Sequence, residues 1–244
     1  MSLAARDRLI VALDVPGLAD AEALLERLAG VVSTFKVGAQ LFTAAGPAAV
    51  ELVRKRGGRV FLDLKYHDIP AQVGGAVREA ARLGVALLTV HASGGGAMLR
   101  AAAEAARAAG GDRPRVLAVT VLTSLDRATL QRELQVPIAV EGHAVHLAAL
   151  AREAGCDGAV ASPHEAARLR ATLGRDWLIV TPGVRPAGAD RGDQARVATP
   201  AGARRAGADC IVVGRPVTAA PDPAAAAAAI LAEFEQAAGA GAAG

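Results

Sequence analysis

Aromatic side chains are scarce in this chain of 244 residues, where Phe, Trp and Tyr together make up 2%. Proteins that bind single-stranded nucleic acid stack the bases on such rings, so the composition offers little for this function. The formal net charge is only +3, and the basic residues are spread along the sequence instead of forming a cluster. We therefore expect no nucleic-acid partner.

Long apolar runs and cysteines are also few. No run approaches the roughly 20 residues that cross a membrane, and the N-terminus, MSLAARDRLIVALDVPG, lacks the pattern of a signal peptide. Cys156 and Cys210 lie in apolar runs without the spacing of metal ligands, which favours free buried thiols in a reducing compartment. The sequence predicts a soluble cytoplasmic protein without a membrane partner or a metal site.

Lysine is rare as well, because only Lys36, Lys55 and Lys65 are lysines among the 27 basic residues. A lysine ammonium is compact and titratable, whereas the arginine guanidinium is a planar fork that hardly titrates. In a sequence that uses arginine almost everywhere, a lysine indicates a position where arginine does not serve. Lys55 lies in the polar run RKRGGR, which is typical of a solvated surface, but Lys36 and Lys65 end apolar runs.

Apolar residues are abundant, at 52% of the chain, and form short runs that alternate with Ala- and Leu-rich helical patterns. The runs are rich in Val, Ile and Leu, which is typical of buried parallel strands. They cover residues 9–13, 34–37, 60–64, 87–90, 116–122, 158–161, 178–181 and 211–213. Eight strand–helix units predict an α/β fold, a (β/α)₈ TIM barrel, with an open doubly wound sheet as the alternative.

No linker divides the sequence, so residues 1–244 are predicted to form a single domain. We expect an ordered core over about residues 7–236, including a last helix after residue 221, and a frayed tail over 237–244. Helix starts are indicated at Pro47, at the capping box Ser162-Pro163-His164-Glu165 and at Thr199-Pro200. The similarity of Ala154-Gly155-Cys156-Asp157 to Ala206-Gly207-Ala208-Asp209 supports repeated strand–helix units.

Charged residues follow the predicted strands, at the ends where barrels of this type hold their active sites. Asp14 follows the first strand, Lys36 lies in the second, and Asp63 and Lys65 end the third, with Asp68 just beyond. Three carboxylates and two lysines at one rim form a charge cluster that a structural core would not need.

The third strand carries the sharpest signal, in the segment DLKYHDIP over residues 63–70. Positions i and i+2 of a strand face the same way, so Asp63 and Lys65 are expected to project together while Leu64 packs outward. A lysine held beside carboxylates carries a proton that it can deliver to a basic carbon. The alternative is a buried ion pair that only holds the strand end, although such pairs stabilise a fold little.

A long segment without helix or strand pattern, residues 182–198, follows the seventh strand and contains Arg185, Arg191 and Gln194. Loops beyond about 12–15 residues are usually functional lids or disordered segments. The eighth strand ends in Gly214-Arg215-Pro216, and the loops after strands seven and eight are the usual phosphate site of this fold. Arg215 offers bidentate contacts to phosphate oxygens. The alternative is that Arg185 and Arg215 are surface charges.

The five histidines are weaker candidates for catalytic residues. His67 and His91 are interpreted as hydrogen-bonded rim residues, and His143, His146 and His164 as residues of helix surfaces. No group of His, Cys and carboxylates has the spacing of a zinc site.

These motifs, taken together, resemble the orotidine 5′-monophosphate decarboxylase family over nearly the whole chain. The segments that carry the resemblance are VALD at 11–14, FKVG at 35–38, DLKYHDIP at 63–70, LTS at 122–124, TPGVR at 181–185, GDQ at 192–194 and VGRPVT at 213–218. The motif DxKxxD alone occurs in a wider superfamily, whereas the full ordered set is specific to this family.

The resemblance implies a (β/α)₈ homodimer that converts orotidine 5′-phosphate to UMP and CO₂ without a metal or organic cofactor. It implies that Lys65 protonates C6 of the pyrimidine, that Asp63 and Lys36 share its charge array, and that Asp68 enters from the neighbouring subunit. Substrate contacts are implied for Asp14, Lys36, Asp63, Ile69, Gln72, Thr123, Ser124, Pro182, Arg185, Gln194, Gly214 and Arg215. Gln72 is a departure, because similar family members often carry a threonine there that contacts the ribose from the partner subunit.

Two other functions stay open. One is a sugar-phosphate decarboxylase or aldolase of the same superfamily, which uses Mg²⁺ held partly by an acidic residue on the second strand. Lys36 occupies that place here and would repel the metal. The other is a non-catalytic barrel that binds nucleotide phosphate, which would need Gly214 and Arg215 but not the set of Lys36, Asp63, Lys65 and Asp68.

Overall fold

The computed structural model describes residues 4–186 and 198–239, and within them eight parallel strands close into a barrel in sequence order. The strands are β1 (Leu9–Ala12), β2 (Thr34–Gly38), β3 (Arg59–Tyr66), β4 (Leu87–His91), β5 (Arg115–Val119), β6 (Gly158–Val160), β7 (Leu178–Thr181) and β8 (Cys210–Val213). Parallel pairing of β1 with β8 completes the barrel. The (β/α)₈ prediction is therefore confirmed, and the open sheet is excluded.

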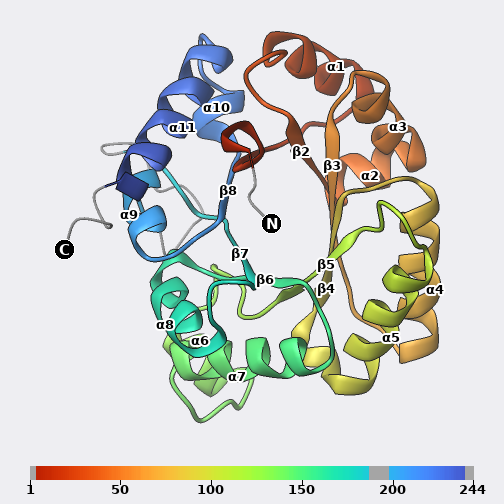
Figure 1. The fold of residues 1–244 in the computed structure, drawn as a ribbon, viewed down its shortest axis with the longest axis vertical. Helices are drawn as coiled ribbons and strands as arrows, with labels where there is room; N and C mark the ends of the chain where they lie inside the picture. Colours follow the sequence, from red (N-terminus) through yellow and green to blue (C-terminus); the bar gives the residue numbers. More distant parts are fainter. Residues whose placement is uncertain (1–3, 187–197, 240–244) are drawn as a thin grey trace.

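The helices form a ring outside the strands (Figure 1). They are α1 (Leu18–Arg27), α2 (Ala39–Ala45), α3 (Pro47–Lys55), α4 (Pro70–Arg82), α5 (Gly95–Ala108), α6 (Arg127–Arg132), α7 (Val140–Glu153), α8 (Pro163–Leu173), α9 (Pro200–Arg205), α10 (Arg215–Thr218) and α11 (Pro223–Gly239), with short 3₁₀ turns η1 (Ala5–Asp7) and η2 (Ala92–Gly94). The helix α11 continues past residue 236, where the sequence was expected to begin fraying. No helix in the two described segments is long and apolar enough to cross a membrane.

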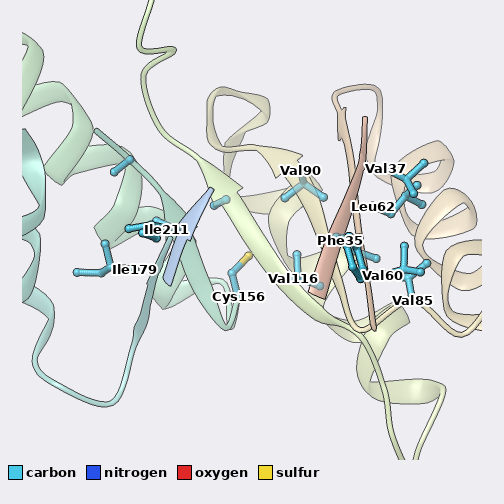
Figure 2. Packing of buried hydrophobic residues seen from close by; sticks show 14 of the residues in the cluster. Phe35, Val37, Val60, Leu62, Val85, Val90, Val116, Cys156, Ile179 and Ile211 are labelled. Carbon is cyan, nitrogen blue, oxygen red and sulfur yellow. The ribbon is translucent and has the colours of Figure 1, made fainter. Parts of the chain in front are cut away.

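Two apolar cores result from the alternation of side chains along the strands. Inside the barrel lie residues such as Ile10, Phe61, Leu117 and Val180. The larger core lies between the strands and the helices. Figure 2 shows part of it, where the labelled side chains are Phe35, Val37, Val60, Leu62, Val85, Val90, Val116, Cys156, Ile179 and Ile211. Leu64 packs against this outer core, as its place between Asp63 and Lys65 predicted.

The predicted helix starts are confirmed. Pro47 begins α3, and Ser162 and Glu165 form a reciprocal capping box at the start of α8. The Thr199 side chain accepts a hydrogen bond from the Gly202 amide at the start of α9. Both cysteines are free and buried, and burial raises the pKa of each thiol to about 12, which leaves them unreactive at neutral pH.

The repeated Ala-Gly-x-Asp segment ties neighbouring strands together at the N-terminal end of the barrel. Asp157, just before β6, accepts a hydrogen bond from the Val116 amide of β5 at 2.9 Å. Asp209, just before β8, accepts one from the Ile179 amide of β7 at 2.8 Å. Arg113 and Arg170 neutralise the two carboxylates, at 2.7 and 2.6 Å. The internal similarity in the sequence therefore has a structural cause.

Candidate active site

A cavity of about 460 Å³ lies at the C-terminal ends of the strands. This size is within the range of small-molecule sites. Its apolar wall comes from the inner face of the barrel and includes Ala12, Phe61, Val119, Val160 and Val212. Its polar lining comes from residues at or just beyond strand ends, as the barrel fold predicts. Of the predicted site residues, Asp14, Lys36, Asp63, Lys65, Thr123, Pro182, Arg185, Gly214 and Arg215 line this cavity.

Four charged side chains form a line of alternating sign on one side of the cavity. The Lys36 Nζ atom lies 2.8 Å from Asp14 Oδ1 and 3.8 Å from Asp63 Oδ2. The Lys65 Nζ atom lies 2.9 Å from the same Asp63 oxygen. Lys36 and Asp63 are both 12% exposed, whereas Lys65 is 38% exposed. The array therefore holds one carboxylate between two ammonium groups and leaves Lys65 able to meet a ligand.

Thr89, on β4, is a site residue that the sequence reasoning missed. Its hydroxyl lies 2.9 Å from Asp63 Oδ1 and 2.9 Å from the backbone nitrogen of Lys65. The side chain is fully buried. A threonine among the Leu and Val residues of β4 was the available signal, but threonine is also a common strand residue.

Gly38, the last residue of β2, is a second site residue that the sequence reasoning missed, and it contributes by having no side chain. A Cβ atom added at Gly38 would lie 2.8 Å from Lys36 Nζ and 3.1 Å from Asp14 Oδ1. The glycine thus leaves the space that the ammonium occupies between the two carboxylates. The sequence contained it in FKVG, but nothing in the sequence showed which side chain would fill that space.

A further part of the cavity lining comes from the segments after β7 and β8. Pro182 and Arg185 come from the first segment, and Gly214 and Arg215 from the second. The Arg185 amide donates to the Ala198 carbonyl at 3.0 Å, so the two ends of the long segment lie side by side. Arg191 and Gln194 lie outside the described residues. The two guanidinium groups and the charged line therefore face a shared cavity from different strands.

A second cavity, of about 860 Å³, lies at the N-terminal ends of the strands. Its arginines include Arg59 and Arg113, which pair with Asp7 and Asp157 at 3.2 and 2.7 Å. Barrels of this type place their chemistry at the other end of the strands, so the first cavity is the candidate active site.

Comparison with known proteins agrees with the geometry. The sequence profile of the orotidine 5′-phosphate decarboxylase / HUMPS family matches residues 7–230. The chain belongs to this family. The orotidine 5′-phosphate decarboxylase of Moorella thermoacetica is 60% identical over 235 residues, which cover 95% of this chain and 93% of the relative. That of Halorhodospira halophila is 56% identical over 234 residues, which cover 96% and 98%.

Two solved structures superpose closely on this chain. The crystal structure of orotidine 5′-phosphate decarboxylase from Lactobacillus acidophilus superposes with a TM-score of 0.83 at 38% identity, over 93% of this chain and 99% of that chain. An uncharacterized conserved protein from Geobacillus kaustophilus gives a TM-score of 0.82 at 40% identity, over 93% and 99%. This chain therefore shares its barrel with a solved orotidine 5′-phosphate decarboxylase.

Four residues that the family resemblance assigned to the substrate are not brought to this cavity within one chain. Asp68, Ile69 and Gln72 are exposed at the start of α4, and Asp68 Oδ1 accepts a hydrogen bond from the Ile69 amide at 2.6 Å. Ser124 is exposed beside Thr123 but does not line the cavity. Their contacts with substrate stay predictions.

His67 and His91 lie at the rim but outside the cavity lining. Their rings stack with centroids 5.3 Å apart, and Ser93 Oγ lies 3.0 Å from His91 Nδ1. Burial lowers the pKa of His91, and the charges of His67 and Lys65 lower it further. A neutral, hydrogen-bonded His91 agrees with the interpretation as a rim histidine. In the described part of the chain, no group of three or more His, Cys, Asp or Glu residues could hold a metal ion.

Proposed function

We propose that this chain converts orotidine 5′-phosphate to UMP and CO₂, with Lys65 as the proton donor. The observation that carries this proposal is the line Asp14–Lys36–Asp63–Lys65 in a cavity that Arg185 and Arg215 also line. The family membership reported above names this activity for relatives that share more than half of the sequence.

The chemistry needs a positive group near C6 of the pyrimidine. The bond between C6 and the carboxylate carbon breaks, CO₂ leaves, and the electron pair stays on C6 in the ring plane, where the π system cannot delocalise it. The Lys65 ammonium stabilises this charge electrostatically and then transfers a proton from Nζ to C6. The product is UMP, and Lys65 regains its proton from solvent. Arginine could not serve here because its guanidinium hardly releases a proton.

The remaining array positions this ammonium. Asp63 is almost buried and lies between two lysines, so its carboxylate fixes Lys65 at 2.9 Å and Lys36 at 3.8 Å. Lys36 in turn lies 2.8 Å from Asp14, which is half exposed and free to bind ribose hydroxyls together with Lys36. Fixed charges of this kind need no reorganisation during the reaction, which is where enzymes gain most electrostatic stabilisation.

The phosphate would bind where the segments after β7 and β8 line the cavity. Arg185 and Arg215 offer planar guanidinium groups for bidentate contacts, and Gly214 lets the chain approach closely. We assign Gln194 to the same phosphate end, although it lies outside the described residues. Binding at this remote group supplies energy that holds the pyrimidine against Lys65.

We further propose a homodimer in which Asp68 completes the partner's site. Asp68 and Gln72 are exposed, and Ile69 between them is 63% exposed, so all three are accessible to a second subunit. In a two-fold dimer, each site would combine Lys65 of one chain with Asp68 of the other. The chain would act as one domain in the cytoplasm, where its buried thiols stay reduced.

The test is a decrease in the ultraviolet absorbance of orotidine 5′-phosphate in the presence of excess EDTA. We expect full turnover after chelation, and Lys65→Ala should lower kcat by at least about 100-fold because positioned proton donors contribute 10²–10⁴-fold. Activity that disappears with EDTA and returns with Mg²⁺ would instead support the sugar-phosphate lyase alternative. Binding of UMP without any turnover would support the non-catalytic barrel.

The shared site has its own test. Lys65→Ala and Asp68→Ala enzymes, each inactive, are mixed under conditions that allow subunit exchange. A mixed dimer has one site lacking both residues and one intact site, so random pairing restores about a quarter of all sites. Activity that stays at the parental level, when mass spectrometry detects mixed dimers, would place Asp68 in its own chain's site.

A further inference from the structure

The strand β3 departs from regular pairing where it carries the two central charges of the site. Leu62 pairs with Leu88 of β4, and the next pair is Tyr66 with Val90, so four steps along β3 match two along β4. The extra residues lie between Leu62 and Tyr66 and include Asp63 and Lys65. Irregularities of this kind re-aim side chains near active sites.

The backbone of Lys65 is strained at this irregularity. Its φ angle is +50°, and among the described residues only Gln135 is another non-glycine residue with positive φ. Such a conformation is costly for a residue with a side chain and persists only where its surroundings hold it. Its backbone N–H also needs an acceptor, because the regular ladder with β4 is interrupted here.

The hydroxyl of Thr89 supplies that acceptor. The Lys65 N–H donates to Thr89 Oγ1 at 2.9 Å, and Thr89 Oγ1 donates in turn to Asp63 Oδ1 at 2.9 Å. The direction is fixed, because a backbone N–H can only donate and an ionised carboxylate can only accept. The other oxygen of Asp63 accepts from Lys65 Nζ at 2.9 Å. The three residues therefore form a closed ring of hydrogen bonds.

We infer that Thr89 is a positioning residue for the decarboxylation: its hydroxyl holds the Lys65 backbone and the Asp63 carboxylate so that the Lys65 ammonium points to the reacting carbon. This inference rests on the proposed function. Thr89 itself is fully buried and does not line the cavity, so it acts through its two neighbours. Its side chain satisfies one buried donor and one buried acceptor, and no apolar residue of the same shape can do both.

The experiment compares Thr89→Val, which keeps the shape and removes the hydroxyl, with Thr89→Ser, which keeps the hydroxyl. We expect Thr89→Val to lower kcat by about 10- to 100-fold, because two buried polar groups lose their partner. KM and the affinity for UMP should change much less, because the proposed phosphate contacts, Arg185 and Arg215, follow β7 and β8 and not β3 or β4. Thr89→Ser should recover most of the loss.

Loss of correctly folded protein must be distinguished from mispositioning of Lys65 in folded protein. We therefore divide kcat by the number of UMP sites measured by calorimetry, so that unfolded molecules do not count. The matched control is Thr120→Val, since Thr120 is also buried at the end of a strand and its hydroxyl donates to the Val160 carbonyl at 3.1 Å. This control should keep the kcat of the unmodified enzyme per UMP site.

The outcomes are distinct. Equal kcat per UMP site for Thr89→Val and Thr120→Val would overturn the inference, as would a Thr89→Ser enzyme as slow as Thr89→Val. If Thr89→Val binds no UMP, Thr89→Ala takes its place with the same expectations, because it makes no steric demand. An unmodified enzyme that binds UMP but does not decarboxylate orotidine 5′-phosphate would refute the proposed function itself, and this inference with it.

Discussion

The substitution Gly38→Ala tests whether the position of Lys36 matters for function. Gly38 has a φ of −95°, which any residue adopts, so an added methyl group does not strain the backbone. The methyl carbon would lie 2.8 Å from Lys36 Nζ and 3.1 Å from Asp14 Oδ1. The perturbation therefore acts on the charged line and leaves the rest of the barrel unchanged.

The magnitude follows from these distances. A methyl carbon packs at roughly 3.5–4.0 Å from its neighbours, so the ammonium must retreat by about 1 Å from its present place. A misplacement of about 1 Å can cost as much as 100-fold in rate. We expect kcat/KM to fall by about 10- to 100-fold, which corresponds to about 1.4–2.7 kcal/mol of transition-state stabilisation.

Folding stability, in contrast to activity, should not decrease in Gly38→Ala. The tip of a lysine side chain moves at little cost, and replacing glycine by alanine reduces the entropy of the unfolded chain by about 0.4–1 kcal/mol. The urea midpoint should therefore stay the same or rise slightly. The matched control is Gly142→Ala in α7, where an added Cβ meets nothing within 4 Å. That variant should be stabilised without any change in kcat/KM.

The assay is the steady-state loss of orotidine 5′-phosphate absorbance, with urea unfolding of the same samples. A Gly38→Ala enzyme with unchanged kcat/KM would refute the argument that the Lys36 ammonium must occupy the space beside Gly38. A joint loss of activity and stability would also refute it, since the methyl group would then disrupt the barrel and not only the charged line.

Three further changes have expected outcomes. Arg215→Ala should mainly raise KM for orotidine 5′-phosphate in steady-state assays, because phosphate is bound before and during the reaction. Asp209→Ala should lower the free energy of unfolding in urea by about 3 kcal/mol, because the substitution leaves the Arg170 charge and the Ile179 amide without this partner. The control is Asp176→Ala at an exposed position, which should change the free energy of unfolding by less than about 0.5 kcal/mol. The free energy of unfolding should also fall as the pH drops below about 6.5. The pKa of His91 is lowered in the folded protein, so the unfolded chain binds the proton at a higher pH than the folded protein does. His91→Gln should reduce this pH dependence.

The barrel could be predicted because its signals are local. Eight apolar runs, proline after a capping residue and repeated Gly-x-Asp turns each depend on a few neighbouring residues. Element bounds were predicted less accurately. The fifth apolar run, 116–122, corresponds to a strand that ends at Val119, and the third run, 60–64, corresponds to a strand that continues to Tyr66. The short helices α2, α6 and α10 were not predicted, since segments of four to seven residues carry little periodicity.

The charged line could be predicted only as a set of residues at one rim. Strand alternation correctly placed Asp63 and Lys65 on one side, and their nitrogen and oxygen atoms lie 2.9 Å apart. Alternation could not reveal the positive φ of Lys65 or the hydroxyl that holds it, because both depend on how β3 pairs with β4. The space beside Gly38 likewise depends on a contact between side chains from two strands.

The rarity of lysine pointed to Lys36 and Lys65 as candidate site residues, but it did not show what each position requires. Lys55 pairs with Glu51 one helical turn away and is 76% exposed, so arginine would serve there equally well. Lys36 fits into a gap that a glycine leaves, where a guanidinium, being larger and planar, would collide with the Asp14 side of the line. In its proposed role as proton donor, Lys65 needs a proton that can leave. The scarcity of lysine therefore indicates two different requirements, one for a small side chain and one for an acidic proton. Two substitutions separate them. Lys36→Arg should mainly impair binding of the ribose, whereas Lys65→Arg should abolish turnover while UMP still binds.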